Sequence, residues 1–286
     1  MRHRMGRLSL FVAVLAFAAS LYAEEPEVSK PLYNTFSDEE EMAMGRSSAE
    51  EIEKTQPLLS DATLQAYVEK VGQRVAQASR RKELQYHFRV VNNPSVNAFS
   101  LPGGYVYVDR GLLDFVETES ELAGVLAHEV GHVVAYHSMN DVARRWLVDR
   151  VMYEGQKAGL LNDQQIHDVL KQYGGPALLF VDRKFSREEE NEADLLGIYN
   201  EARAGWDPAG LVAFLRRLIR MGANQDLFEL LMRRHPLPED RVDALGVELK
   251  QIPAVAGWKK NSAAFHAMKD RLGTLPPSPP PVKAPS

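Results

Sequence analysis

Apolar residues recur at helical spacing in several stretches of the chain. Leu64, Val68, Val71 and Val75 follow one another at intervals of three or four residues, which predicts a helix over about residues 61–78. Capping residues mark further helix starts, because a side-chain oxygen can accept from the free N–H groups of a first turn. Such starts stand at Ser37, Thr118, Ser186 and Asp207, and the first three helices are expected to reach about residues 48, 136 and 205. Residues 139–183 have a less regular helical pattern, with a break at residues 174–176.

Two other stretches alternate apolar and polar residues. Tyr86, Phe88 and Val90 share one face of an extended segment, which predicts a strand over residues 86–91. Residues 97–108 form two extended pieces around the Pro-Gly-Gly break at residues 102–104, which is typical of a hairpin. Because proline cannot donate to a strand ladder, Pro102 favours an edge position.

The first residues resemble a secretory signal peptide. Three arginines precede an apolar run from Leu8 to Leu21, which is shorter than the roughly 20 apolar residues that a membrane span needs. We expect cleavage after Ala23, which leaves one domain over residues 24–273. The alternative is an uncleaved N-terminal anchor. Residues 274–286 are rich in proline, and we expect them to form a disordered tail.

Charge and cysteine content exclude several classes of protein. Removing residues 1–23, with their three arginines, lowers the formal charge from −5 to −8, and this acidity argues against a nucleic-acid partner. The chain contains no cysteine, so a disulfide scaffold, a thiol nucleophile, a thiolate metal site and a lipoprotein anchor are all excluded. Any bound metal must therefore be held by histidines and carboxylates.

The segment His128-Glu129-Val130-Gly131-His132 is the strongest chemical feature of the sequence. Two histidines four residues apart project from one face of a helix, so both imidazoles can reach one zinc ion. Glu129 lies about 100° round the helix, where it can flank the metal and take a proton from a metal-bound water. The alternative is a solvated polar face, because the apolar residues of this helix lie on its opposite side.

A second group of carboxylates follows Ser186. Glu190 and Asp194 are four residues apart and share a helix face, so Glu190 can be a third zinc ligand while Asp194 accepts the second N–H of a ligating histidine. Small residues at Ala193 and Gly197 allow a close approach to the histidine helix. Glu192 points away and is the weaker candidate ligand. The alternative is a solvated acidic run that favours the helix N-terminus.

Together these segments resemble the zincin metallopeptidases of family M48, and among them the periplasmic BepA-like members. The resemblance covers about residues 40–250 and rests on an ordered set of segments: Asn97–Gly104, His128–His132, Ser186–Arg187, Glu190–Asp194, His235–Pro236 and Arg241. It implies that Glu190 is the glutamate ligand and Glu129 the catalytic base. It further implies that His235 can occupy the fourth zinc position and hold the enzyme latent, and that Arg241 stabilises charge near the site. For His235 a plain loop position before a proline turn remains an alternative.

The resemblance also implies a fold and a class of substrate. We expect a mainly helical α+β zincin fold with a small antiparallel sheet, whose edge strand receives an extended polypeptide through main-chain hydrogen bonds. Asn97 and Ala98 are the expected peptide contacts. The expected cofactor is one Zn²⁺ per chain, and the expected substrates are unfolded or misfolded proteins of the periplasm. The sequence carries neither the multi-span membrane portion nor the tetratricopeptide array of some relatives, so a membrane or outer-membrane assembly partner is left open.

Two functions from other classes compete with a peptidase. A holdase would bind unfolded chains without cutting them, although a purely structural zinc site needs no base such as Glu129. An adaptor would dock its proline-rich tail on a partner, although such tails are more often flexible.

Overall fold

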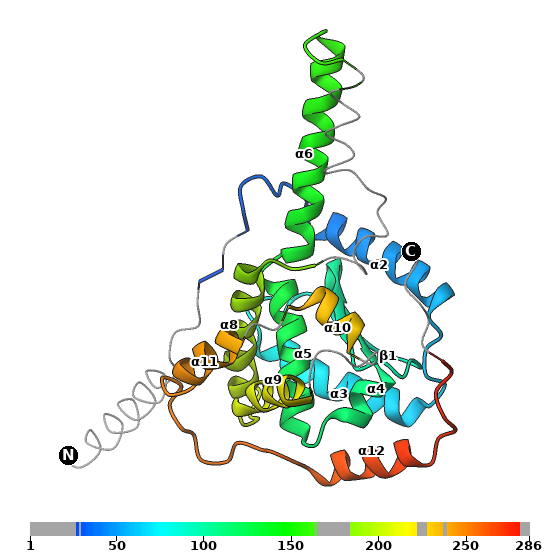
Figure 1. Cartoon of the computed structure of the whole chain (residues 1–286), viewed down its shortest axis with the longest axis vertical. Coiled ribbons are helices and arrows are strands. Elements are labelled where there is room, and N and C mark those ends of the chain that lie inside the picture. Colours follow the sequence, from blue (N-terminus) through cyan, green and yellow to red (C-terminus); the bar gives the residue numbers. More distant parts are fainter. Residues whose placement is uncertain are drawn as a thin grey trace, which may run out of the picture.

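The computed structural model describes residues 27–28, 30–162, 164, 184–221, 228–236 and 239–280. The expected signal peptide and the expected break at residues 174–176 lie outside these residues. The described elements are α2 (Asp38–Thr55), α3 (Ala62–Ala78), β1 (His87–Val91), β2 (Ala98–Leu101), the 3₁₀ turn η1 (Pro102–Gly104), β3 (Tyr105–Asp109), α4 (Arg110–Phe115), α5 (Glu119–Val134), α6 (His137–Lys157), α8 (Arg187–Arg203), α9 (Ala209–Met221), α10 (Glu229–Arg234), α11 (Glu239–Glu248) and α12 (Ala263–Gly273). The expected mainly helical α+β class is confirmed (Figure 1).

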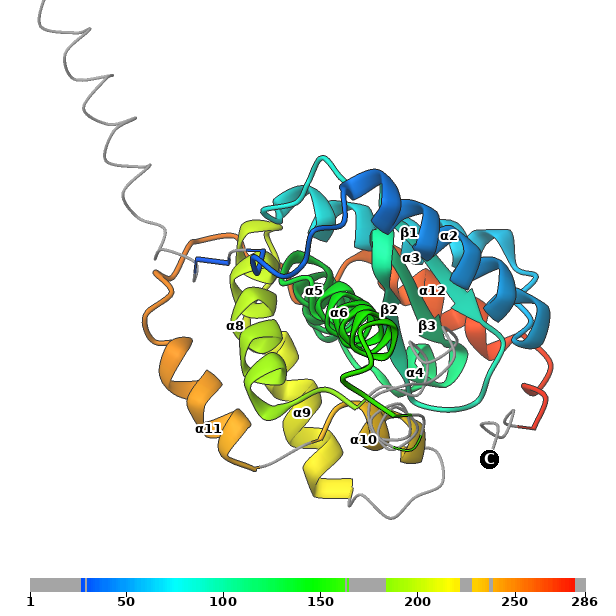
Figure 2. The same ribbon diagram turned by 90° about the horizontal axis from the view of Figure 1, so that it is seen from above.

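Helix α5 lies at the centre of the molecule, with α8 and α9 on one side and the sheet on the other (Figure 2). All 16 residues of α5 are buried, including His128 and His132. The polar side of this helix therefore faces other protein elements, and the alternative of a solvated polar face is wrong.

Helices α5 and α8 approach closely because small residues stand where they cross. A Cβ atom on Gly131 would lie 2.8 Å from the carbonyl oxygen of Ala193, and a Cβ on Gly197 would lie 3.2 Å from the backbone nitrogen of His128. The close approach expected from Ala193 and Gly197 is thus present, and it brings the first turns of α8 beside the two histidines.

Helix α8 begins as its capping box predicts. Ser186 Oγ accepts from the backbone N–H of Glu189, and the Glu189 carboxylate accepts from the backbone N–H of Ser186. This reciprocal cap fixes the start of the helix, and therefore the position of Glu190 in its first turn.

The sheet has three strands in the order β1-β3-β2. The expected hairpin is present, because β2 pairs antiparallel with β3 around η1. The expected antiparallel character of the whole sheet is wrong, since β1 pairs with β3 in parallel. The chain passes from β1 across to the far edge before it turns back, so the returning strand β3 fills the central position and runs in the direction of β1.

Strand β2 stands at an edge of the sheet, as expected, while Pro102 lies in the turn rather than within the strand. The opposite edge is covered by side chains of α3. Gln65 donates to and accepts from the backbone of Val90, and Glu69 accepts from the N–H of Phe88. All four residues of β2 are themselves buried.

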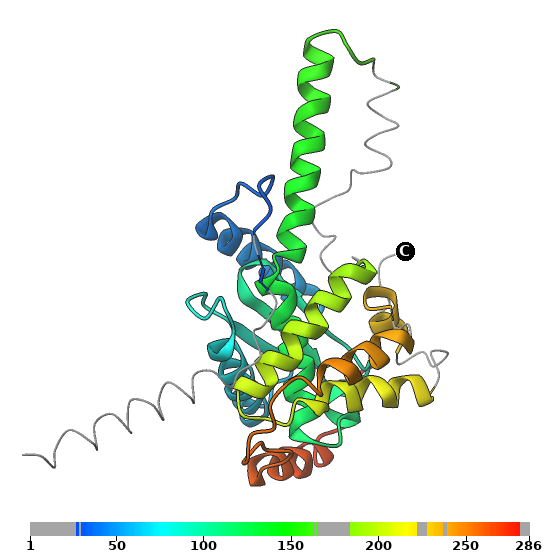
Figure 3. The ribbon, with the colours of Figure 1, turned by 90° about the vertical axis from the view of Figure 1, so that its left-hand side faces the viewer.

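Helix α6 rises from the body of the molecule (Figures 1 and 3). It is separated from α5 by a sharp turn in which Tyr136 has φ 57° and ψ 23°. Among the described residues, Tyr136 is the one non-glycine residue with positive φ. Arg81 stabilises this turn, because its guanidinium lies 4.1 Å from the centre of the Tyr136 ring and donates to the carbonyl of Val133. None of the helices in the described ranges combines the length and apolar character that a membrane crossing needs.

The C-terminal part of the described chain returns to the core. Leu275 packs against core residues, and Arg110 Nη1 donates to the carbonyl oxygen of Pro276 at 2.7 Å. Core contacts thus reach into the first residues of the expected tail, 274–286, whose last six residues lie outside the described part. The disorder expected for residues 274–286 stays a prediction.

Candidate metal centre

The two histidines of α5 converge through their Nε2 atoms, which lie 3.0 Å apart. This convergence follows from their spacing, because residues four apart stand one above the other on a helix. Both side chains are almost fully buried, with exposed fractions of 6% for His128 and 1% for His132.

Glu190 reaches the same point from the first turn of α8. Its carboxylate oxygens lie 3.6 Å from His128 Nε2 and 3.5 Å from His132 Nε2. The side chain has no exposed surface. The alternative of a solvated acidic run is therefore wrong for Glu190.

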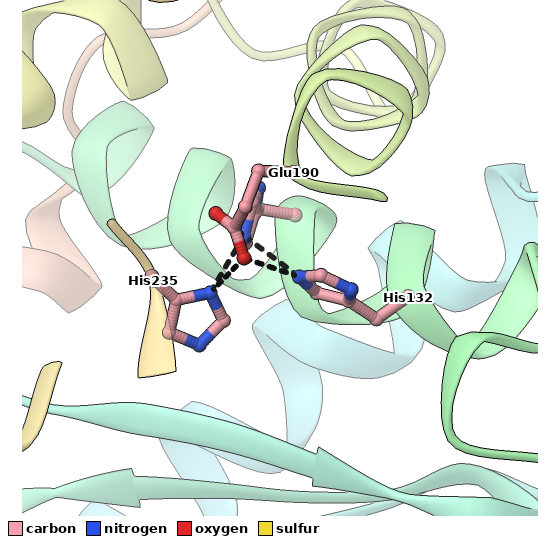
Figure 4. A group of neighbouring side chains, drawn as sticks. His132, Glu190 and His235 are labelled. Carbon is pink, nitrogen blue, oxygen red and sulfur yellow. Dashed lines mark hydrogen bonds and ion pairs between the residues drawn. The ribbon is translucent and has the colours of Figure 1, made fainter. Parts of the chain in front are cut away.

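His235 supplies a fourth nitrogen to this cluster. It directly follows α10, and its Nδ1 lies 2.8 Å from Glu190 Oε1 and 3.3 Å from His128 Nε2. Figure 4 shows the Glu190 carboxylate between the rings of His235 and His132. His235 is 4% exposed, so the structure buries it in the cluster rather than in an open loop.

The four donors fit a zinc ion. Tetrahedral coordination at about 2.0–2.2 Å places neighbouring donor atoms about 3.3–3.6 Å apart. Of the separations between the His128, His132, Glu190 and His235 donors, those of 3.3, 3.5 and 3.6 Å match this spacing, and those of 2.8 and 3.0 Å are shorter. Four ligand atoms, one from each residue, lie within 4.8 Å of one another. Imidazole nitrogen and carboxylate oxygen are ligands that zinc prefers.

The neighbouring histidines favour the ionised form of the Glu190 carboxylate, which is the form that binds a cation. Burial alone would raise the pKa of Glu190, but His235 and His132 outweigh it and hold the pKa well below its usual value. Burial likewise disfavours the charged form of His128, while a hydrogen bond to Asp194 and the charges of Glu190 and Asp194 raise the pKa of His128.

Asp194 lies behind His128, where the sequence places it. Its Oδ1 is 2.9 Å from His128 Nδ1. A carboxylate at this nitrogen keeps the N–H there, and the lone pair of His128 is then at Nε2, which faces the cluster.

Arg241, on α11, contacts the carboxylates of both Asp194 and Glu190 on α8. Its Nε and Nη2 donate to the two oxygens of Asp194, each at 2.8 Å, and its Nη1 lies 2.7 Å from Glu190 Oε2. The guanidinium thus holds the acidic groups that face the histidines. This geometry lets Arg241 position both carboxylates, and the charge-stabilising role that the resemblance implies for it stays a prediction.

Glu129 lies beside the cluster without belonging to it. Its Oε1 is 3.5 Å from His235 Nε2, and the side chain is 1% exposed. This position leaves the carboxylate free of the donor set, as a proton acceptor requires.

A small apolar cavity, with about 20 Å³ of room for a water-sized molecule, lies beside Glu129, His128 and His235. It runs between α5, α9 and α10, and its wall also includes Arg241. Its apolar lining consists of Val125, Leu211, Phe214, Leu215, Leu218 and Leu231.

The expected peptide contacts are buried. Asn97 and Ala98 have no exposed surface, and the carbonyl oxygen of Asn97 accepts from the N–H of Asp109. Their role in substrate binding stays a prediction, and it requires that the covering elements move.

His137 was not singled out from the sequence. Its Nδ1 lies 2.8 Å from His132 Nδ1, and its Nε2 lies 3.1 Å from Glu192. On a continuous helix a residue five positions on lies about 140° away, so the sequence spacing gave no reason to join His137 to His132.

Comparison with known proteins gives the family. A sequence profile described as Peptidase family M48 matches residues 62–248. The chain is 29% identical over 260 residues to "Beta-barrel assembly-enhancing protease" of Escherichia coli (strain K12), covering 86% of this chain and 51% of that protein. It is 30% identical over 200 residues to "Mitochondrial metalloendopeptidase OMA1" of Schizosaccharomyces pombe, covering 70% and 56%, and 25% identical over 218 residues to "Metalloprotease YcaL" of Escherichia coli (strain K12), covering 72% and 79%.

The chain belongs to peptidase family M48. It spans about half the length of the beta-barrel assembly-enhancing proteases that it matches.

Proposed function

We propose that this protein is a zinc-dependent endopeptidase in which His128, His132 and Glu190 hold the metal. The observation that carries the proposal is the convergence of two imidazoles from α5 and one carboxylate from α8 on a single buried point, with the carboxylate of Glu129 beside it and outside the donor set. A catalytic zinc site has three protein ligands and an open position, whereas a structural site closes all four.

Zinc, when bound, supplies a Lewis acid that polarises a carbonyl and lowers the pKa of water. Glu129 is the general base: it accepts a proton as water attacks the scissile carbonyl and passes it to the leaving amine. Asp194 and Arg241 orient His128 and Glu190 so that their donor atoms face one point.

His235 makes the site latent in this proposal. Its Nδ1 lies with the other three donors, so with zinc bound it would supply a fourth ligand and keep water and substrate away from the metal. Movement of α10 would withdraw His235 and open that position. The buried state of Asn97 and Ala98 supports the same view, because a substrate strand also needs this region to open.

The substrate is an extended, unfolded segment that adds to β2 as a further strand. Such recognition uses main-chain hydrogen bonds and therefore tolerates many sequences. The apolar residues that line the cavity beside Glu129 add one preference, for an apolar side chain next to the scissile bond, which the cavity admits once movement of α10 has widened it.

The cellular role follows from these properties and from the N-terminal segment. We infer secretion to the periplasm and proteolytic quality control of unfolded or misfolded envelope proteins there. A relative named for enhancing β-barrel assembly supports this setting, and an outer-membrane assembly partner is consistent with it.

Digestion of a permanently unfolded protein tests the proposal against the holdase alternative. The zinc-loaded chain should cut the substrate internally, a chelator should stop the cutting, and added zinc should restore it. A chain that binds the substrate but leaves it intact with zinc present would instead be a holdase.

A further inference from the structure

We infer that His137 and Glu192 form a hydrogen-bonded support that fixes the zinc-binding tautomer of His132. The inference rests on the proposed zinc site and adds two positioning residues to it. Its basis is a continuous chain of contacts: His132 Nδ1 to His137 Nδ1 at 2.8 Å, and His137 Nε2 to Glu192 Oε2 at 3.1 Å.

The directions of these hydrogen bonds follow from the metal site. His132 Nε2 faces the cluster, 3.0 Å from His128 Nε2, so it must carry the lone pair that binds zinc. The N–H of His132 is then at Nδ1, and His137 Nδ1 accepts from it. His137 in turn carries its own N–H at Nε2, where the Glu192 carboxylate accepts. Each step fixes the next, and no atom is left with a conflicting role.

The two zinc-binding histidines are thus supported in parallel ways. A ligating histidine commonly donates its second N–H to a carboxylate or a carbonyl. His128 uses Asp194 directly, whereas His132 reaches the carboxylate of Glu192 through His137. Among these residues, Glu192 is the partly exposed one, with 39% of its side chain accessible, while the His137 side chain is 3% accessible.

The backbone between α5 and α6 supports this assignment independently. On an uninterrupted helix His137 would point about 140° away from His132. The left-handed conformation of Tyr136 ends α5 and turns His137 back to its partner. A non-glycine residue is strained in this region. The ring contact with Arg81 and the hydrogen bond from Arg81 to Val133 stabilise that turn.

Phe185 completes the enclosure of His132. Its ring stacks on the imidazole at a centroid distance of 3.8 Å, and the side chain is 2% exposed. The face of His132 is therefore shielded, and His137 Nδ1 takes the place that water would otherwise fill at His132 Nδ1.

Zinc affinity, measured by competition with a chromogenic chelator, tests the inference. His137→Leu should weaken zinc binding by about 10–100-fold, as is typical when the partner of a ligating histidine is lost. His137→Asn should recover most of this loss, because the amide oxygen stands as many bonds from Cβ as Nδ1 does and can accept from His132. A merely structural role predicts no such rescue, provided that the zinc-free melting temperatures of the two variants match.

Glu192→Ala, with Glu188→Ala on the same exposed turn as its control, extends the test. Glu192→Ala should weaken zinc binding by less than His137→Leu, since water can replace a partly exposed carboxylate, and Glu188→Ala should not weaken it. Wild-type affinity in His137→Leu, or an Asn variant no better than Leu, would overturn the inference. If the wild-type chain itself binds no zinc, the proposed function fails instead.

Discussion

The Nδ1 atom of His235 lies 2.8 Å from Oε1 of Glu190, so a residue that follows α10 closes the site formed by α5 and α8. This contact joins three separate parts of the chain at one point. It also predicts that the enzyme is held back by its own side chain.

His235→Ala should therefore raise the rate of digestion of an unfolded protein severalfold, because the fourth position becomes open to water. Arg233→Ala, an exposed change on α10 just before His235, is the control and should leave the rate unchanged. A fall in the rate with His235→Ala would make His235 a residue that assists the reaction.

Glu190→Ala should remove zinc from the chain as purified, whereas Glu192→Ala should retain about one ion per chain with reduced affinity. The reason is that Glu190 lies among the donors, while Glu192 touches the far side of His137. Metal analysis after gel filtration checks this. If Glu192→Ala lost its zinc and Glu190→Ala retained it, the third zinc ligand would be Glu192 and not Glu190.

Arg241→Met should destabilise the zinc-free protein by about 3–5 kcal/mol, because it leaves the carboxylates of Asp194 and Glu190 buried without their cation. The loss should be smaller with zinc bound, since the ion supplies positive charge to the same group. Chemical unfolding with and without zinc measures both values, with the exposed Arg233→Met as control. An equal loss of stability with and without zinc would contradict the idea that Arg241 and zinc both compensate the charge of Glu190.

Cleavage sites in an unfolded protein, identified by mass spectrometry, should be enriched in Leu, Phe and Met beside the scissile bond. Val125→Phe narrows the cavity and should shift the preference to small residues, because Val125 lines it three positions before His128. Unchanged zinc content should accompany the shift. If neither protein preferred any residue beside the scissile bond, the cavity would have no part in substrate binding.

Glu201→Gln should change how stability depends on pH. Burial raises the pKa of Glu201 well above its usual value, so the folded chain keeps this group protonated where the unfolded chain ionises it. Stability from the protonated group is complete below the ordinary pKa of about 4.5 and is lost as the pH rises towards the folded value. Glu201→Gln should therefore gain stability over wild type as the pH rises from 5 to 8, in denaturant titrations. A constant difference across that range argues against a protonated Glu201.

Local patterns in the sequence predicted most of the helices that carry the site. Ser186 fixed the start of α8 through its capping box, and the spacing of His128 and His132 predicted their convergence. The alternation around Phe88 predicted β1, and the Pro-Gly-Gly break predicted the hairpin of β2 and β3.

Long-range relationships could not be obtained in the same way. The sequence of β1 does not predict its parallel pairing with β3, because the strands of this sheet have similar apolar sequences. The polar face of α5 resembles a solvated one, because histidines and carboxylates that meet inside a protein have the same composition as those that meet water. The partnership of His137 depends on a left-handed residue at Tyr136, which no helical periodicity reveals.

Zinc content and proteolysis, measured together on wild type and Glu129→Gln, test the central claim most directly. Both proteins should contain one zinc ion per chain, since Glu129 lies outside the donor set. The digestion of an unfolded protein by Glu129→Gln should fall by about 10²–10⁴-fold, the usual contribution of a general base. A zinc-loaded Glu129→Gln chain that cuts as fast as wild type would contradict the proposed mechanism.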